Sequence, residues 1–299
     1  MMRFDISYTT RFAYEHDVVE SQNELRAAPV ADDRQQVVHY DVRTVPSSRV
    51  FSYTDYWGTR VDAFGVRGAH HELVVVADAT VETSPPAVLA ASPRFSDLTP
   101  AFRDQHLEYL ERSAHVDWGD ALAAEVAAKR DGADEDVVGF VLALHRLIGT
   151  TCTYAPGATY VGVTVDEVWE AHEGVCQDFA HLLVAMCRSG GVPARYVSGY
   201  LFTRDDSTGG DVTDGDRVQV QTHAWVEVAI PGYGWWGLDP TNRQQVGERH
   251  VKIGHGRDYD DVAPMKGVYG GAADHTLEVS VDMRRAAAVE AQVQQQQQQ

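Results

Sequence analysis

The sequence contains few cysteines, few basic residues and no long apolar stretches, and each shortage excludes a class of protein. Three cysteines in 299 residues are too few, and odd in number, for a disulfide framework, and no Cys/His ladder indicates a structural zinc site. No run of about 18 apolar residues could form a membrane-spanning helix, and the N-terminal residues lack the apolar core of a signal peptide. We therefore expect a reducing, cytoplasmic setting, where a single well-placed cysteine is expected to be a reactive thiol rather than half of a disulfide.

Charge is the second imbalance. The chain has 25 Lys and Arg residues against 44 Asp and Glu residues, a formal net charge of −19. Such a surface repels phosphate backbones and anionic lipid headgroups, so we expect neither nucleic acid nor membranes as partners. The surplus acid favours solubility. The 44% content of hydrophobic residues is enough for a sizeable core and excludes a wholly disordered chain. The oligomeric state stays open.

Residues 1–83 have the pattern of short β-strands. Phe4, Ile6 and Tyr8 alternate with polar residues, and similar runs follow between turn signals. This spacing predicts a β-sandwich or barrel-like module. Because it contains no cluster of Cys, His and acidic residues, we expect it to contribute no catalytic side chain.

Residues 84–285 change from helical to strand patterns, which makes the whole chain α+β. An amphipathic stripe beginning at Asp136 predicts one helix, with His145 on its charged, solvated side. A second helix is predicted from about Val175 to a stop at Gly190-Gly191. Strands are predicted afterwards at 194–202, 218–230, 235–239 and 277–283. We expect the acidic segment 205–216 to be a solvated loop and the Gln-rich tail, 286–299, to be disordered.

The string EGVCQDFAH (173–181) carries the strongest chemical signal. It places Cys176 in the first turn of a helix, directly after a glycine that lets the backbone approach closely. A helix N-terminus stabilises thiolate over thiol. Its free N–H groups can also hold an oxyanion. Taken alone, Cys176 could equally be a small buried hydrophobe.

Two later motifs favour the catalytic interpretation. THAWVEV (222–228) places His223 at the head of a strand, and WWGLDPTN (235–242) places Asp239 at the end of the next strand. A turn at Pro231-Gly232 would set the two side chains next to each other. With Cys176, they would form a nucleophile, a general base and an orienting carboxylate. Asp239 before a proline could also simply initiate a turn.

In this order, GVCQDFAH, GVPARYVSGY, THAWVEV and WWGLDPTN resemble the core of the transglutaminase-like superfamily, which is papain-like. The first 80 or so residues resemble the β module that precedes this core in a bacterial branch. The resemblance covers most of the chain except the tail. It implies a papain-like core with Cys176 as nucleophile, His223 as base and Asp239 as orienting carboxylate.

The resemblance implies acyl transfer through a Cys thioester on a peptide or protein substrate. Family members include protein cross-linkers, deamidases and thiol peptidases. We expect a peptidase or amidase rather than a transamidase, because a cytoplasmic cross-linker would endanger its own compartment. The competing interpretation is a non-catalytic binding or scaffold module that keeps the fold. No cofactor or metal is expected, since segment 205–216 does not fit the EF-hand pattern of a calcium site.

Papain-like enzymes often add a side-chain donor to the oxyanion hole. Tyr154 and Tyr160 are the candidates here, and Tyr154 is preferred. Asp178, in the first helical turn, is expected to complement the helix dipole or contact a neighbouring loop. His181 lies about 500° around the helix from Cys176 and is expected to have a core or surface role.

Overall fold

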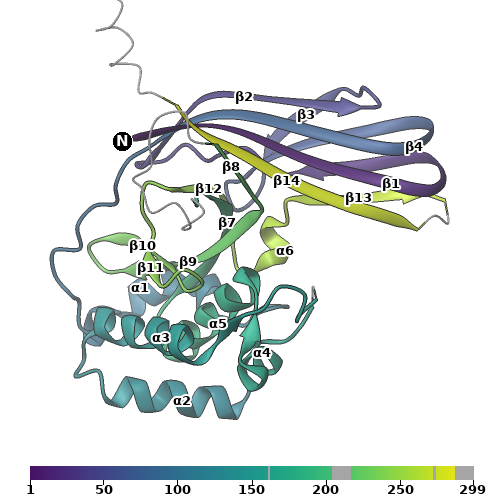
Figure 1. Cartoon of the computed structure of the whole chain (residues 1–299). Coiled ribbons are helices and arrows are strands. Elements are labelled where there is room, and N and C mark those ends of the chain that lie inside the picture. Colours follow the sequence, from purple (N-terminus) through teal and green to yellow (C-terminus); the bar gives the residue numbers. More distant parts are fainter. Residues whose placement is uncertain (161, 204–216, 272–273, 287–299) are drawn as a thin grey trace, which may run out of the picture.

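The computed structural model describes residues 1–160, 162–203, 217–271 and 274–286, which form an α+β fold (Figure 1). A large antiparallel sheet packs above a second, smaller sheet that is covered by helices. The expectations for segment 205–216 and for the tail lie outside the described residues, except that residue 286 is described and ends β14. Among the described residues, no helix combines the length and the apolar character needed to cross a bilayer.

The large sheet is assembled from both ends of the chain. Its main strand order is β2-β4-β1-β14-β8, with β3 added on β4 and β13 added on β1. The strands are β1 (Met2–Leu25), β2 (Gln35–Val45), β3 (Val50–Thr54), β4 (Arg60–Thr83), β8 (Arg217–Val220), β13 (Met265–Gly270) and β14 (His275–Ala286). The expected division at residue 83 assigns β8, β13 and β14 to the catalytic part, whereas their pairing places them in this sheet.

Long paired strands replace the several short strands expected in residues 1–83. Residues 73–76 and 80–82, which the alternating pattern suggests as two separate short strands, belong to one strand, β4, which pairs with β1 along most of its length. The register of this pair shifts between Ala13 and Glu20. A bulge of this kind bends and twists a strand. One pair of strands can therefore serve two differently oriented halves of the sheet.

The catalytic part consists of helices packed on a five-stranded sheet of order β11-β10-β9-β7-β12. Its strands are β7 (Ala194–Leu201), β9 (Thr222–Ile230), β10 (Gly234–Asp239), β11 (Gln244–Gln245) and β12 (His250–Gly256); β5 (Thr153–Tyr154) and β6 (Glu173–Gly174) form a separate parallel pair. Its helices are α1 (Pro100–Gln105), α2 (Asp120–Asp131), α3 (Val137–Thr151), α4 (Val165–Ala171), α5 (Cys176–Ser189) and α6 (Tyr259–Val262), with 3₁₀ turns at Phe95–Asp97 and Leu107–Tyr109.

Residues close in the sequence determine where the two predicted helices begin and end. The Asp136 side chain accepts a hydrogen bond from the Gly139 amide and begins α3. Helix α5 begins at Cys176 and has its C-cap at Gly190, and Gly191 follows with a φ of 77°, a conformation that glycine adopts readily. Its side chains from Asp178 to Arg188 are all buried. Helix α5 is therefore the central helix of the catalytic part.

The predicted strand 218–230 is in fact two strands. Residues before Gln221 form β8, which pairs with β14 in the large sheet, and residues after it form β9 in the small sheet. The chain thus passes from one sheet to the other directly before His223.

One apolar cluster joins the two sheets. Phe4 and Ile6 of the large sheet share it with Phe202, which follows β7, and with Val251 and Ile253 of β12. The rings of Phe4 and Phe202 lie 5.1 Å apart between centroids. Since burial of apolar surface is the main stabilising term in folding, the large sheet and the catalytic part stabilise one another.

This shared cluster predicts a large effect at Phe202, which is fully buried. Phe202→Ala should lower the free energy of unfolding by about 3–5 kcal/mol, the usual cost of truncating a core aromatic residue. Phe51→Ala on β3, where the side chain is 58% exposed, is the matched control and should change it by less than about 0.5 kcal/mol. Urea denaturation measures both. Similarly small losses in the two variants would contradict a shared core.

Candidate active site

Cys176 begins α5 and is half-buried. The first hydrogen bond within the helix runs from the Phe179 amide to the Val175 carbonyl, at 3.0 Å. The amides of the first turn therefore precede the helical ladder and can donate to a ligand. A Cβ at Gly174 would lie 3.0 Å from the Asp178 side chain, closer than an ordinary contact, so a small residue suits the position just before this turn.

Asp178 fixes the entrance of the helix. One of its carboxylate oxygens, Oδ2, accepts hydrogen bonds from the Val175 amide (2.8 Å) and the Thr159 hydroxyl (2.6 Å). The expected contact with a neighbouring loop is therefore present. His181, one turn further on, is buried, and its Nε2 accepts the Tyr259 amide at 3.1 Å. It has the core role expected and does not face the thiol.

His223 and Asp239 meet across the β9–β10 hairpin. The two strands are antiparallel, with Val226 opposite Leu238. His223 donates from Nε2 to Oδ2 of Asp239 at 2.8 Å. The Cys176 thiol also lies near enough to the imidazole to raise its pKa, and with Nε2 engaged by Asp239 the ring nitrogen left for the thiol is Nδ1. The structure thus brings together the three residues that the sequence motifs proposed.

The carboxylate of Asp239 is completely buried and densely bonded. Besides His223, Oδ2 accepts the His250 ring at 3.1 Å and the Asn242 side-chain amide at 2.8 Å, while Oδ1 accepts the Asn242 backbone amide at 3.0 Å. Burial alone would raise the pKa of Asp239, but the hydrogen bonds from His223 and His250 outweigh it and hold the pKa well below its usual range. Asp239 both opens a turn and orients His223.

The sequence interpretation missed three neighbours of Asp239. His250 accepts the Gly247 amide at Nδ1 (3.2 Å), which leaves its Nε2–H to donate to the carboxylate. Asn242 follows Asp239 by three residues, and its backbone amide donates to the Asp239 side chain, a local pattern that aspartate often forms and that could have been recognised. His145 was expected to be solvated, and this is wrong: it is buried, and its Nε2 lies 2.9 Å from the Asp239 carbonyl oxygen.

His223 is held as a cation. Burial by itself lowers the pKa of its imidazole, but hydrogen bonds to Asp239 and Cys176, and the charges of both partners, raise the pKa to about 9. The arrangement therefore favours an imidazolium beside the thiol at neutral pH. Such a pair can attack a carbonyl carbon and then protonate a leaving amine.

A cleft of about 890 Å³ opens at Cys176 and His223. Among the described residues that line it there is no Asp, Glu, Lys or Arg, although the chain is strongly acidic. None of these lining residues comes from residues 1–83, but Gln219 and Val220 belong to β8 and so to the large sheet. The large sheet therefore forms part of the cleft wall with its edge strand.

Tyr154 lines the same cleft and is 51% exposed. Burial, followed by the charge of Cys176, raises the pKa of its hydroxyl, which keeps the hydroxyl protonated and able to donate. Tyr160 is 71% exposed and is not among the residues that line the cleft. The geometry is therefore compatible with Tyr154 as the oxyanion donor, and this role stays a prediction.

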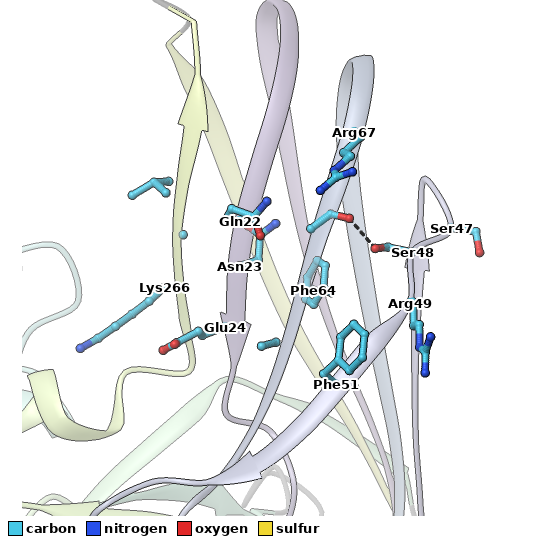
Figure 2. Close-up of a pocket in the computed structure, with 14 residues that line it drawn as sticks. Gln22, Asn23, Glu24, Ser47, Ser48, Arg49, Phe51, Phe64, Arg67 and Lys266 are labelled. Carbon is cyan, nitrogen blue, oxygen red and sulfur yellow. Dashed lines mark hydrogen bonds between the residues drawn. The ribbon is translucent and has the colours of Figure 1, made fainter.

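A second hollow of about 880 Å³ lies on the large sheet (Figure 2). Its walls come from β1, β3, β4, β13 and the loop before β3, where the Ser48 hydroxyl donates to the Gly65 carbonyl (Figure 2). The described residues that line it include no Cys and no His. Although Ser47, Ser48 and Lys266 line it, it lacks the thiol and the imidazole that the sequence motifs bring together, so the cleft at Cys176 is the candidate active site.

One group of side chains has the composition of a metal site. The nearest ligand atoms of His223, Asp239 and His250 lie within 4.8 Å of one another. Both imidazoles, however, donate Nε2–H to the same carboxylate oxygen. A cation bound there would have to displace both hydrogen bonds, so the present arrangement fits proton positioning better than metal ligation.

Comparisons with known proteins agree with this geometry. The sequence model of the transglutaminase-like superfamily matches residues 120–240, and that of the bacterial transglutaminase-like N-terminal region matches residues 4–82. Both parts of the resemblance inferred from the motifs are thereby confirmed.

Individual relatives extend the match. An uncharacterized protein from Mycobacterium leprae is 37% identical over 288 residues, covering 96% of this chain and 100% of the relative. A protein-glutamine gamma-glutamyltransferase from Pseudomonas aeruginosa is 31% identical over 106 residues, 34% of this chain but only 14% of that protein. The crystal structure of a candidate cysteine protease from Cytophaga hutchinsonii has a TM-score of 0.75 and 22% identity over 96% of this chain and 91% of that one, which shows a common fold.

The hydrogen bonds around His223 predict its titration. In the wild type the imidazole should titrate near pH 9. In Asp239→Asn it should titrate well below that, because the negative charge that raises its pKa is lost while the burial that lowers its pKa remains. NMR of the labelled imidazole measures both midpoints, with the exposed ring of His71 as internal reference. The stability contributed by the raised pKa is full below about pH 6.5 and is lost as the pH rises through 9. Equal midpoints in the two proteins would show that Asp239 does not hold the imidazolium.

Proposed function

Because the chain belongs to the transglutaminase-like superfamily, we propose that it is an enzyme that transfers an acyl group from an amide or peptide bond to water through a thioester on Cys176. The observation that carries the proposal is the arrangement of one thiol, one imidazole and one buried carboxylate: Cys176 and His223 line the same cleft, and His223 is hydrogen-bonded to Asp239. The cysteine thiols are free in the structure, which suits the reducing, cytoplasmic setting that we propose with it.

In the starting state of this proposal the Cys176 proton has passed to Nδ1 of His223, and the first step is attack of the resulting thiolate on the carbonyl carbon. A C–S bond forms and the carbonyl π electrons move to the oxygen. The resulting oxyanion lies near the N-terminus of α5, where first-turn amides can donate to it. In this proposal the Tyr154 hydroxyl supplies a further donor from the cleft wall.

The second step breaks the C–N bond. The proton on Nδ1 of His223 passes to the departing amine, and the acyl group remains on Cys176 as a thioester. Asp239 keeps its charge throughout and stabilises the imidazolium, while His250 and Asn242 hold the carboxylate in place. Water then gives a proton to His223 and its oxygen attacks the thioester carbon. The C–S bond breaks, the carboxylic acid leaves, and the thiolate and the imidazolium are restored.

The cleft favours a neutral substrate. Gln177, Gln219 and Gln221, together with threonines, offer uncharged donors and acceptors along its walls. A peptide backbone or a side-chain carboxamide can match such groups without burying an unpaired charge. We therefore propose a peptide or protein substrate that is uncharged at the scissile bond.

Transamidation is the second candidate activity, with a primary amine in place of water. The matching segment of the protein-glutamine gamma-glutamyltransferase from Pseudomonas aeruginosa favours it. The chemistry up to the thioester is the same, so the acceptor alone separates the two activities. A non-catalytic binding or scaffold module, the competing interpretation, would need neither the charged imidazole nor the thiol.

Selective alkylation separates an active thiol from a scaffold. Burial raises the pKa of Cys152 to about 11 and, more strongly, that of Cys187 to about 12, so neither should react with iodoacetamide at pH 7. Cys176 should be labelled alone, and His223→Ala should slow its labelling by at least about tenfold. Peptide mapping by mass spectrometry gives the site and the rate. Equal labelling of wild type and His223→Ala would favour the scaffold.

Turnover tests the nucleophile and the acceptor together. Cys176→Ala should abolish processing of a peptide library while leaving the melting temperature nearly unchanged, and Cys187→Ala, a buried cysteine in the same helix, should keep it. Mass spectrometry with a fluorescent primary amine present distinguishes hydrolysed from amine-linked products. We expect hydrolysis to dominate. Activity that persists in Cys176→Ala would refute the assignment.

A further inference from the structure

The face of the small sheet that carries His223 also carries a buried cluster of charges. Along β9, Glu227 follows His223 on the same face, and Arg195 of β7 lies directly opposite it. Glu227 accepts hydrogen bonds at Oε2 from Arg195, at 2.8 Å from Nε and 2.6 Å from Nη2, and from Lys252 of β12 at 2.6 Å. All three side chains are about nine-tenths buried.

The cluster has one positive charge too many. Burial by itself raises the pKa of Glu227, but Lys252 and Arg195 lower it by more, to about 2, so the carboxylate is ionised. Burial lowers the pKa of Lys252 only to about 8, so at neutral pH the lysine is mostly charged. Two cations therefore share one buried anion. An uncompensated buried charge is costly unless another group pairs with it.

A cavity of about 350 Å³ lies against this cluster, within the size range of small-molecule sites. Trp225, Trp235 and Val246 form apolar walls, and Trp235 stacks on the Arg195 guanidinium at 3.7 Å. The Trp225 indole N–H is buried and has no hydrogen-bond acceptor among the described residues. The walls thus offer apolar surface together with unused donor capacity and excess positive charge.

The mouth of the cavity differs from its interior. Asp32 and Asp33 are exposed there, beside Arg34, whose Nη2 donates to the carbonyls of Ser84 and Gly247. Together these three groups carry a net charge of −1, and the charge of Asp32 is one of those that act to raise the pKa of Lys252. Because they are in contact with solvent, water screens them from the buried cluster. The interior excess is therefore the feature that selects a ligand.

We propose that this cavity binds a small organic carboxylate with an apolar body, whose anionic group completes the Arg195–Glu227–Lys252 cluster. The apolar body of the ligand would contact the tryptophans that line the cavity, and its carboxylate would pair with the cations. The site is separate from the Cys176 cleft, and the proposal does not depend on the proposed function. His250 lines the cavity and also donates to Asp239, so its ring reports on occupancy.

Phenylacetate is the probe, and its neutral amide, phenylacetamide, is the matched negative ligand. Binding is measured by calorimetry on Cys176→Ala protein, which removes the thiol as an alternative contact, and by the NMR resonances of the labelled His250 ring. We expect phenylacetate to bind and to shift the His250 resonances, and phenylacetamide to do neither. Equal binding of the two probes would overturn the proposal.

Two substitutions move the charge excess in opposite directions. Lys252→Met leaves a neutral Arg195–Glu227 pair and should weaken phenylacetate binding at least about tenfold, the loss expected for one charge-assisted hydrogen bond. Glu227→Gln adds to the excess and should tighten binding severalfold. Lys266→Met, at an exposed lysine on β13, should change nothing.

Thermal denaturation shows whether each variant is folded. Should Lys252→Met fail to fold, Glu227→Gln still decides, because an unchanged or weaker affinity there contradicts the proposal. Affinity that is the same in wild type, Lys252→Met and Glu227→Gln would place the ligand elsewhere and overturn it.

Discussion

The buried carboxylate of Asp239 is the constraint on which the catalytic part depends. It is a negative charge with no access to solvent, and such a charge is tolerated only when donors surround it. The donors come from separate parts of the chain: His223 of β9, His250 of β12 and Asn242 of the turn after β10. His145 of α3 meets the carbonyl of the same residue. Asp239 thereby links β9, β10 and β12 through its carboxylate and α3 through its carbonyl oxygen. These bonds set the position of the His223 imidazole.

The large sheet contributes to the site without contributing a nucleophile or base. Its edge strand β8 runs directly into β9, so the pairing of β8 with β14 determines where the chain enters the small sheet just before His223. The cluster around Phe4 and Phe202 holds the two sheets together. This explains in physical terms why an N-terminal β module accompanies the core: it anchors one wall of the cleft.

Short-range signals in the sequence were sufficient for the nucleophile and its hairpin. The helix beginning at Asp136, the start of α5 near Val175, the stop at Gly190-Gly191 and the turn at Pro231-Gly232 each depend on a few neighbouring residues, and each is present as predicted. The family motifs then related His223 and Asp239 to the thiol across the longer interval.

Features that depend on distant pairing could not be predicted in this way. The alternating pattern continues through Gln221, so nothing local shows that β8 and β9 join different sheets; β14, some sixty residues later, decides it. His145 was misplaced because an amphipathic stripe identifies only one buried face, whereas α3 is also covered by the turn at Asp239. His250 has no local signal, because its partner is set by the pairing of β12 with β7.

The small sheet concentrates its charges on the face opposite to the apolar residues that meet α5. Ala224, Val226 and Val228 pack into the helical core, while His223, Trp225 and Glu227 alternate with them. Trp225 stands between the catalytic pair and the Glu227 cluster and packs edge-on against His250 at 5.3 Å. Gly199 makes room for it, since a Cβ there would lie 2.4 Å from the indole ring.

That tryptophan separates two electrostatic environments on one sheet. On one side, several donors compensate the negative charge of Asp239 and hold the imidazole as a cation. On the other side, Arg195 and Lys252 outnumber Glu227, and burial together with their charges lowers the pKa of nearby His255 to about 3, which keeps that ring neutral. Apolar bulk between two such groups limits the water that would otherwise screen each of them. The same sheet can therefore keep a protonated histidine at the thiol and a neutral one beside a positively charged cavity.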